Sequence, residues 1–269
     1  MSVDHYENFP VGSWLLPRHL RRAVHAIYRV ARYADDVADE GALTAQERLA
    51  QLAQIEADLT AIQRGEAPIL PVMQALAPVV DDYALPLECF FQLISAFRQD
   101  VLKTRYESFA ELVEYCRRSA NPIGRLMLWL YSEHDARSLA MSDGICTALQ
   151  LINFLQDIAV DWQKGRVYLP LQDMARFGVT EQQIAAGDTG AGWKPLMRQQ
   201  VERARRLLQA GAPLARRLPG RFGLEVKLIV LGGDRILKKL HDTGGEVFRV
   251  RPVMTWKDWC YIGWRTVFA

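Results

Sequence analysis

The sequence predicts an all-α protein, a single-domain bundle of helices around a central apolar cavity. Helix-capping signals and polar side chains at helical spacing recur along the chain, whereas strand signals are scarce. Half of the 269 residues are hydrophobic, which is enough to bury one large core. No hinge-like linker and no repeat of fixed period divides the sequence. We therefore expect residues 1–269 to form one domain.

The amino-terminal half predicts five helices that are separated by prolines and turns. Capping boxes at Thr44 with Glu47 and at Ser108 with Glu111 mark two of the helix starts. An Asn-Pro step at 121–122 should interrupt the last of these helices. The expected helices cover 18–41, 44–64, a short stretch within 68–86, 86–103, and a helix from 108 that is interrupted at 121–122.

The carboxyl-terminal half predicts one long helix followed by shorter ones. The long helix should cover 134–162, and residues 165–170 should leave it in an extended conformation. The glycine-rich segment 187–192 is expected to be a flexible loop. Further helices are expected at 194–217, 223–241 and 255–267.

Four oxygen-bearing side chains follow one face of the long helix. Steps of three, four and four residues separate Gln150, Asn153, Asp157 and Asp161, and such steps keep side chains on one helix face. The other residues here are almost all apolar, so the helix should be buried nearly all round. Its polar stripe should then line an interior cavity, where carboxylates must be paired, protonated or bound to metal.

A second stripe lies in the first helix, where Tyr28, Arg32, Asp35 and Asp39 stand four, three and four residues apart among small or apolar neighbours. Two such stripes facing each other would bind Mg²⁺, with Mn²⁺ as a substitute, and the metal would bind a diphosphate. The alternative is that each stripe is a solvated helix face with local ion pairs. The candidate metal ligands are Asp35, Asp36, Asp39, Asn153, Asp157 and Asp161.

Composition and motifs argue against several other functions. A net charge of +2 without a basic stripe gives no reason to expect a nucleic acid partner. The four cysteines form no CxxC pair and are expected to be reduced core residues. The amino terminus predicts no secretion signal, and no apolar stretch is expected to reach the ~20 residues that span a bilayer, so we expect a cytoplasmic protein. GDTGAG at 187–192 follows no strand, so no nicotinamide-binding fold is expected.

These residues resemble the squalene/phytoene synthases, a family with the trans-prenyltransferase fold. DDVAD (35–39) is similar to the family's first aspartate-rich motif, and QLINFLQDIAVD (150–161) is similar to its second. Tyr28 and Arg32 stand at the family's spacing before the first motif, and DVLKTRY (100–106), the 115–124 segment and GRVYLP (165–170) also align. The resemblance covers nearly the whole chain. It implies an isoprenoid synthase fold with Mg²⁺ and diphosphate at the cavity mouth and apolar walls around isoprenoid tails.

Two segments resemble one branch of the family more closely. HYENFP (5–10) stands where many members have His-Ser-x-Ser-Phe, and SANPIGRL (119–126) stands where most have Ala-Gly-x-Val-Gly. Both variants are similar to the hydroxysqualene synthases of the bacterial hopanoid pathway, which ionise presqualene diphosphate and let water capture the rearranged cation. The resemblance implies presqualene diphosphate as substrate, no NADPH, and handover to other enzymes of that pathway.

Two other functions stay open. One is head-to-head condensation of two prenyl diphosphates, such as farnesyl diphosphate, to presqualene diphosphate, squalene or phytoene. The other is a non-catalytic relative that acts in assembly or lipid carriage. The intact acids at 35, 39, 157 and 161 argue against a carrier, because a carrier has no use for costly buried charge.

The expected chemistry assigns roles to further residues. A departing diphosphate needs positive charge, which Arg32, Lys164 and Arg166 can add to that of the metal. The faces of aromatic rings stabilise a carbocation in a dry pocket. The candidates are Phe9, Tyr28, Tyr115, Phe154 and Tyr168, although an aromatic residue taken alone is more often plain core. The polar stripe adds Gln150 as a substrate-binding residue. The resemblance adds His5, Asn8 and Arg251, the last preferred over Arg249.

Asn121 is a candidate for placing the water that captures the cation. At an Asn-Pro step the helix opens locally and leaves free carbonyl groups beside an amide side chain. The alternative is a simple kink in which the asparagine satisfies backbone groups.

The carboxyl-terminal stretch TWKDWCYIGWRTVF (255–268) combines three tryptophans with Lys257 and Arg265. It could rest on the inner face of a membrane, where a lipophilic product is delivered. Alternatively, the aromatic residues belong to a terminal helix that packs on the body of the protein. We prefer this second interpretation.

Overall fold

The computed structural model describes residues 16–268, and these residues fold almost entirely into helices. The predicted site residues His5, Asn8 and Phe9 lie outside the described residues. Within the described range the only β-structure is an isolated parallel bridge between Arg105 and Val167. The helices are α1 (Arg21–Asp39), α2 (Ala45–Gln63), α3 (Pro71–Tyr83), α4 (Leu87–Leu102), α5 (Phe109–Ser119), α6 (Asn121–Leu130), α7 (Ala136–Gln156), α8 (Ile158–Gln163), α9 (Leu171–Phe177), α10 (Glu181–Ala186), α11 (Trp193–Gly211), α12 (Leu214–Arg217), α13 (Gly220–Asp242) and α14 (Trp256–Phe268).

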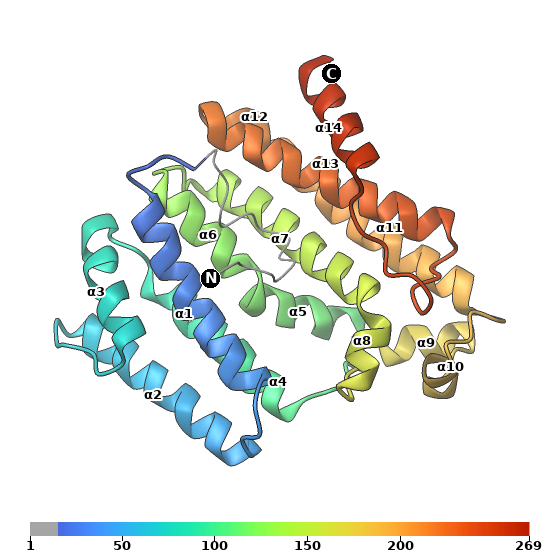
Figure 1. Cartoon of the computed structure of the whole chain (residues 1–269), viewed down its shortest axis with the longest axis horizontal. Coiled ribbons are helices and arrows are strands. Elements are labelled where there is room, and N and C mark those ends of the chain that lie inside the picture. The colour runs from blue at the N-terminus through green and yellow to red at the C-terminus, as the bar shows by residue number, and fades with distance from the viewer. Residues whose placement is uncertain (1–15, 269) are drawn as a thin grey trace.

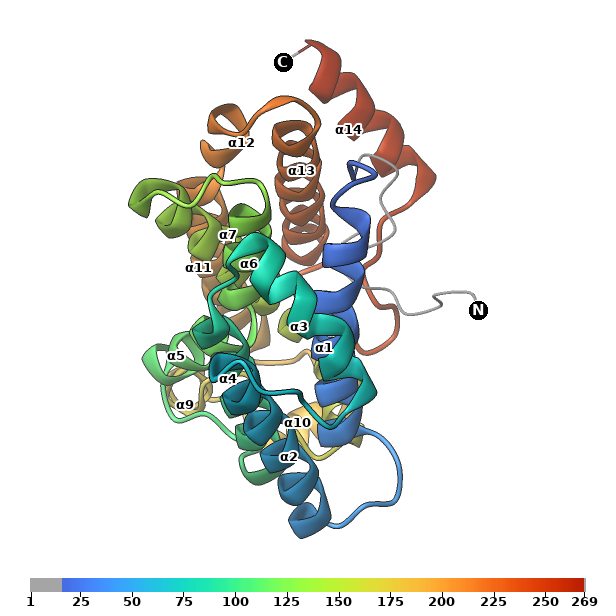
Figure 2. The same cartoon turned by 90° about the vertical axis from the view of Figure 1, so that its left-hand side faces the viewer.

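The helices pack in two groups that meet at α4 (Figure 1). In the first group α1 contacts α2, α3 and α4, and α2 contacts α4. In the second group the long helix α7 contacts α5, α6, α11 and α13. Figure 2 shows α1 on the opposite side of α7 from α11. Because α4 also contacts α5 and α6, the two groups form one bundle, as the sequence predicts.

Helix α7 is the buried core helix that the sequence predicts. Its buried side chains include Ile145, Leu149, Ile152 and Leu155. By length and composition α7 is also the one described helix able to cross a bilayer, so the expectation that no stretch is long enough is wrong. However, 61% of its most apolar window is buried inside the protein, which is the property of a core helix.

Two glycines allow neighbouring helices to approach α7 closely. A Cβ atom at Gly124 of α6 would lie 2.4 Å from Ser142 Oγ and 2.5 Å from Cys146 Sγ. A Cβ atom at Gly211, where α11 ends, would lie 2.5 Å from the carbonyl oxygen of Met141. Any larger residue would force the helices apart or displace their side chains. The glycines therefore set the distance at which α6 and α11 pack on α7.

Most of the predicted elements are confirmed, including the extended segment 165–170 and the break between α5 and α6. The capping box of Thr44 and Glu47 is complete. At the second box Ser108 accepts a hydrogen bond from the Glu111 backbone, but the Glu111 carboxylate accepts from the Glu107 backbone rather than from Ser108.

Three details differ from the prediction. The expected helix over 134–162 breaks at Asp157, whose φ of −103° and ψ of 12° separate α7 from α8. The expected helix over 194–217 ends at Gly211, because Pro213 has no N–H to continue it and instead starts the short α12. Two short helices, α9 and α10, were not predicted, although Thr180 and Gln183 form a capping box at the start of α10.

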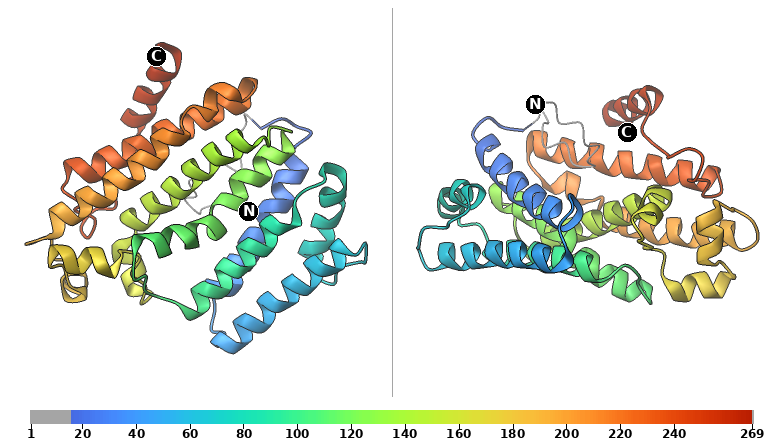
Figure 3. Two further views of the ribbon diagram at one scale, coloured as in Figure 1. Left: turned by 180° about the vertical axis from the view of Figure 1, so that it is seen from behind. Right: turned by 60° about the horizontal axis from the view of Figure 1, so that its bottom comes forward.

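The carboxyl-terminal helix α14 is attached to α13 by only one face and projects from the bundle (Figure 3). Ile262 is fully buried, and the buried Asp258 binds Arg235 and Lys239 of α13. In contrast, the side chains of its three tryptophans are 56–71% exposed. The packed-helix interpretation preferred from the sequence is therefore wrong for these tryptophans. The expectation of four core cysteines is also wrong for Cys260, which is exposed on this helix, whereas the other three are buried.

Candidate active site: two acidic motifs at one end of an apolar cavity

A cavity of about 520 Å³ lies between the two groups of helices. Residues of α1, α4 to α8, α12 and α13 line it. Its size is within the range of small-molecule sites, roughly 300–1,000 Å³. All eight residues of the two predicted stripes line the same cavity, which confirms that the stripes face each other: Tyr28, Arg32, Asp35, Asp39, Gln150, Asn153, Asp157 and Asp161.

The acidic residues gather where α1 and α7 end. Asp39 is the last residue of α1, and Asp157 is the C-cap of α7. The carboxyl end of a helix carries the negative pole of its dipole. Both motifs therefore place carboxylates where the backbone already favours a cation. The rest of the cavity wall is mostly apolar and includes Ile27, Leu128, Leu149, Phe222 and Ile229.

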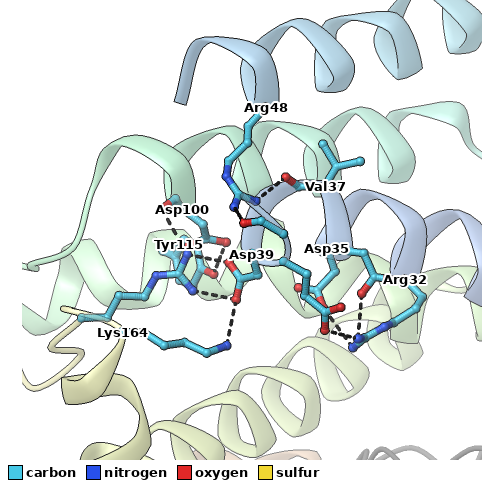
Figure 4. Close-up of polar contacts among 12 residues, drawn as sticks. Arg32, Asp35, Val37, Asp39, Arg48, Asp100, Tyr115 and Lys164 are labelled. Atoms are coloured by element: carbon cyan, nitrogen blue, oxygen red, sulfur yellow. Dashed lines mark hydrogen bonds and ion pairs between the residues drawn. The ribbon is translucent and has the colours of Figure 1, made fainter. Parts of the chain in front are cut away.

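Arg166 binds the first motif. Its guanidinium group forms two hydrogen bonds with the Asp39 carboxylate, at 2.5 and 2.8 Å, and Lys164 Nζ lies 3.4 Å from the same carboxylate (Figure 4). Arg32 lies one turn earlier on α1, with Nη1 3.3 Å from Asp35 Oδ2 and Nη2 2.7 Å from Asp36 Oδ1. The cations predicted from the sequence are thus present, but each one is paired with a carboxylate of α1.

Arg251 binds the second motif in the same way. Its Nε and Nη2 donate hydrogen bonds to the two oxygens of the Asp157 carboxylate, at 2.5 and 3.0 Å. The pair lies at the point where the helix breaks between α7 and α8. Arg251 lies in the segment between α13 and α14, so this contact ties the carboxyl-terminal part of the chain to the second motif.

The end of α1 that holds Asp39 is fixed by Arg48 of α2. Arg48 donates hydrogen bonds to the carbonyl oxygens of Val37 at 2.7 Å and Gly41 at 2.9 Å (Figure 4). A cation at this position satisfies carbonyl groups that a helix end leaves without partners and interacts favourably with the helix dipole. Sequence reasoning missed this residue, because Arg48 belongs to neither polar stripe.

Burial raises the pKa of one carboxylate in each motif. Burial, followed by the charge of Asp39, raises the pKa of Asp35 to about 6. Burial, followed by the charge of Asp157, raises the pKa of Asp161 to about 7. Burial also acts on Asp39, but its hydrogen bonds with Arg166 hold the pKa of this carboxyl below its ordinary value. Within the two motifs, Asp35 and Asp161 are therefore the carboxylates whose pKa is raised.

This donor set fits a divalent metal that is shared with a substrate. No three acidic, histidine or cysteine side chains among the described residues lie close enough to enclose one ion. The donors are instead divided between α1 and the junction of α7 and α8. Mg²⁺ is usually held by one or two carboxylates, with the remaining positions filled by water and substrate phosphates. Asp36 is the one predicted ligand that does not line the cavity, because it points to Arg32 instead.

An aromatic wall continues from the acidic end. The rings of Phe154 and Tyr168 are stacked, with centroids 3.8 Å apart, and Tyr115 packs against both. All three line the cavity, as does Tyr28. These four predicted aromatic residues therefore belong to the wall of the cavity. Tyr106, which sequence reasoning did not select, stacks behind Tyr168 and is fully buried.

The structure corrects the role expected for Asn121. Its side chain is 2% exposed, is not part of the cavity wall, and accepts a hydrogen bond from Thr147 Oγ1 at 2.9 Å. The Asn-Pro step starts α6, with the proline in its first turn, so the amide serves packing between α6 and α7. A water-placing role for Asn121 is thus contradicted by its position.

Comparison with known proteins identifies the family. The model of the squalene/phytoene synthase family matches residues 3–258. The chain belongs to this family. The hydroxysqualene synthase of Sinorhizobium fredii is 35% identical to it, over 94% of this chain and 86% of the relative. The hydroxysqualene synthase of Rhodopseudomonas palustris is 36% identical, over 92% of this chain and 84% of the relative. The crystal structure of squalene synthase HpnC from Alicyclobacillus acidocaldarius superposes on this structure with a TM-score of 0.82 and is 38% identical in sequence. The match covers 89% of this chain and 90% of the HpnC chain.

The predicted resemblance and the predicted isoprenoid synthase fold are therefore confirmed. As a squalene/phytoene synthase family member, the protein is an enzyme of isoprenoid biosynthesis, and the family acts on prenyl diphosphates. The cavity matches such substrates, because it combines a charged end with a long apolar wall.

Proposed function

We propose that the enzyme ionises presqualene diphosphate and that water captures the rearranged carbocation, which gives hydroxysqualene and diphosphate. One observation carries the proposal: a single cavity joins both acidic motifs to an apolar, aromatic wall. Its relatives with more than 90% coverage of this chain include the hydroxysqualene synthases named above. The reaction consumes no reductant, so we propose that NADPH is not required.

We propose Mg²⁺ as the cofactor, with Mn²⁺ as a substitute. Asp35 and Asp39 on α1, and Asn153, Asp157 and Asp161 at the second motif, are the residues that would hold it. When bound, the metal would neutralise the charge of the departing diphosphate. The raised pKa values of Asp35 and Asp161 support this assignment, since a divalent cation would stabilise the ionised forms that burial disfavours.

The protein's own cations would assist the departure of the diphosphate. Arg166 and Arg251 line the cavity next to the two motifs, and Lys164 lies beside Asp39. An arginine fork binds carboxylate and phosphate oxygens with the same geometry, so both arginines can also bind the diphosphate. Beyond them, the faces of Tyr28, Tyr115, Phe154 and Tyr168 would stabilise the carbocation and exclude bulk water.

Product analysis tests the proposal. Purified enzyme with Mg²⁺ and without NADPH is given presqualene diphosphate in one tube and farnesyl diphosphate in another. We expect hydroxysqualene from presqualene diphosphate and no product from farnesyl diphosphate. Consumption of farnesyl diphosphate would instead establish a head-to-head condensing synthase. Inertness toward both, with no binding of Mg²⁺ and pyrophosphate, would favour a non-catalytic relative.

We further propose that the enzyme is cytoplasmic and rests on the membrane through α14. Trp256, Trp259 and Trp264 are exposed on this helix, and tryptophan favours the membrane–water interface. Arg249, Lys257 and Arg265 add positive charge in the same part of the chain, which anionic lipids attract. Replacing Trp256 and Trp264 by serine should abolish co-sedimentation with anionic vesicles and leave activity on detergent-dispersed substrate unchanged. Undiminished sedimentation of this double variant would contradict the proposal.

A further inference from the structure

Asp100 is a buried carboxylate in the cavity wall that neither acidic motif includes. It lies near the end of α4 and is 7% exposed. Its Oδ2 accepts a hydrogen bond of 2.8 Å from the hydroxyl of Tyr115. Its Oδ1 is buried without a hydrogen-bond partner among the described residues. A buried acceptor of this kind is costly unless a ligand or an ordered water satisfies it.

The surroundings of Asp100 orient its carboxyl group without neutralising it. Arg166 donates a hydrogen bond of 3.3 Å to the backbone carbonyl of Asp100. The same guanidinium group also donates two hydrogen bonds to the carboxylate of Asp39. Tyr115 belongs to the aromatic wall and packs against Tyr168 and Phe154. Asp100 therefore stands between the acidic end and the aromatic wall, where a carbocation would lie after the diphosphate departs.

We propose that Asp100 holds the water that captures the carbocation and accepts its proton. This inference rests on the proposed function and assigns to Asp100 the role that the sequence suggested for Asn121. Oδ1 would accept a hydrogen bond from the water, while the Tyr115 hydroxyl fixes the carboxyl group through Oδ2. Asp100 would thus be a catalytic residue that contacts the nucleophile.

The step balances in atoms and charge. The C–O bond to diphosphate breaks and its electron pair leaves with the diphosphate. A lone pair of the water oxygen then forms the new C–O bond to the rearranged carbocation. The protonated alcohol gives its proton to Oδ1 of Asp100, and the neutral acid later releases that proton to solvent. No oxidant or reductant is involved.

The state of Asp100 suits this exchange. Burial raises the pKa of Asp100 to about 7, against the effects of the Tyr115 hydrogen bond and the Arg166 charge. A group with a pKa near the working pH can both accept and release a proton. The negative charges of Asp39 and Asp35 raise the pKa of Asp100 further. Burial raises the pKa values of the Tyr106 and Tyr168 hydroxyls, which stay protonated.

The test measures two quantities in the variant Asp100→Asn: the share of hydroxysqualene among the products, and the release of diphosphate, which reports ionisation of the substrate. This variant keeps the shape of the side chain, an acceptor for Tyr115 and the backbone carbonyl that binds Arg166. With presqualene diphosphate and Mg²⁺, without NADPH, diphosphate release and hydroxysqualene are measured in the same tubes. We expect the hydroxysqualene share of the products to fall at least about tenfold. Diphosphate release should fall much less, with the balance in other cation-derived products.

Two further variants separate chemistry from folding. Tyr115→Phe removes the hydrogen bond to Oδ2 but keeps the carboxylate and the aromatic ring, so the hydroxysqualene share should fall less than it does in Asp100→Asn. Asp58→Asn makes the same change at another carboxylate, 1% exposed, on α2 away from the cavity, and should leave the hydroxysqualene share unchanged. An unchanged hydroxysqualene share in Asp100→Asn, or an equal loss of diphosphate release and product, overturns the inference. If the wild type forms no hydroxysqualene, the proposed function itself fails.

Discussion

Replacing Asp161 by asparagine should stabilise the metal-free protein while it removes most of the activity. Burial and the charge of Asp157 raise the pKa of Asp161 from 3.8 to about 7. Keeping such a carboxylate ionised at pH 8 costs at most about 4 kcal/mol. Water and side-chain relaxation reduce this cost, so the variant should gain about 1–3 kcal/mol of unfolding free energy at pH 8. This gain corresponds to a rise of roughly 2–8 °C in Tm.

The sign of the pH dependence follows from the same shift. The folded state binds the proton of Asp161 more tightly than the unfolded state does. Wild-type stability therefore falls as pH rises between about 4 and 7, and the deficit is complete above pH 7. The advantage of Asp161→Asn should be full at pH 8 and absent near pH 4. Activity should fall about 10²- to 10³-fold, because a charge-stabilising group of the site is lost.

The assay is thermal unfolding without metal at both pH values, together with product formation at pH 8. Asp39→Asn is the matched control. Asp39 is paired with Arg166, and the two side chains are only 18% and 14% exposed. Removing the Asp39 carboxylate leaves the half-buried guanidinium group of Arg166 without its ion-pair partner. This variant should therefore lose about 1–3 kcal/mol of unfolding free energy. A loss of stability in Asp161→Asn, like that expected for Asp39→Asn, would show that the folded protein stabilises the Asp161 carboxylate instead of disfavouring it.

Three further predictions concern the metal site and the packing around it. The affinity of the enzyme for Mg²⁺ with pyrophosphate, measured by calorimetry, should rise from pH 6 to pH 8. Asp35 and Asp161, with pKa values of about 6 and about 7, must lose their protons to bind metal. An affinity that does not change with pH would contradict this. Gly124→Ala should cost about 1–3 kcal/mol by thermal unfolding, since its Cβ would lie 2.4 Å from Ser142 Oγ; an unchanged Tm would show that α6 and α7 move apart freely. Arg48→Met should cost about 1–3 kcal/mol, because it leaves the carbonyls of Val37 and Gly41 without their donor; equal Tm values would mean that water replaces it.

The bundle and the two acidic motifs could be predicted because local periodicity determines them. In α7 the apolar residues surround the stripe from Gln150 to Asn153, so burial and a cavity follow from spacing alone. The break at Asp157 could not be foreseen, because its partner Arg251 lies 94 residues further along the chain. A pairing of this kind depends on tertiary structure and leaves no local pattern.

Residues outside the stripes were harder to predict for the same reason. Both residues that the stripes omit act through contacts with other helices. Asp100 of α4 binds Tyr115 of α5, and Arg48 of α2 binds the end of α1. Asn121 had a local signal, the Asn-Pro step, but that signal describes the start of a helix and not the direction of the side chain. The exposure of Trp256 and Trp264 depends on how far α14 extends past α13, which periodicity does not determine.

We propose that the two acidic motifs together hold a metal–diphosphate group. Crystals of the enzyme grown with Mn²⁺ and pyrophosphate test it most directly, because anomalous scattering locates Mn²⁺ without ambiguity. We expect Mn²⁺ peaks within about 2.0–2.3 Å of carboxylate oxygens from both motifs, with pyrophosphate bound between them. The ligands should include Asp35 or Asp39 from the first motif and Asp157 or Asp161 from the second. Absence of metal at the motifs, or metal bound to one motif without diphosphate, would contradict it.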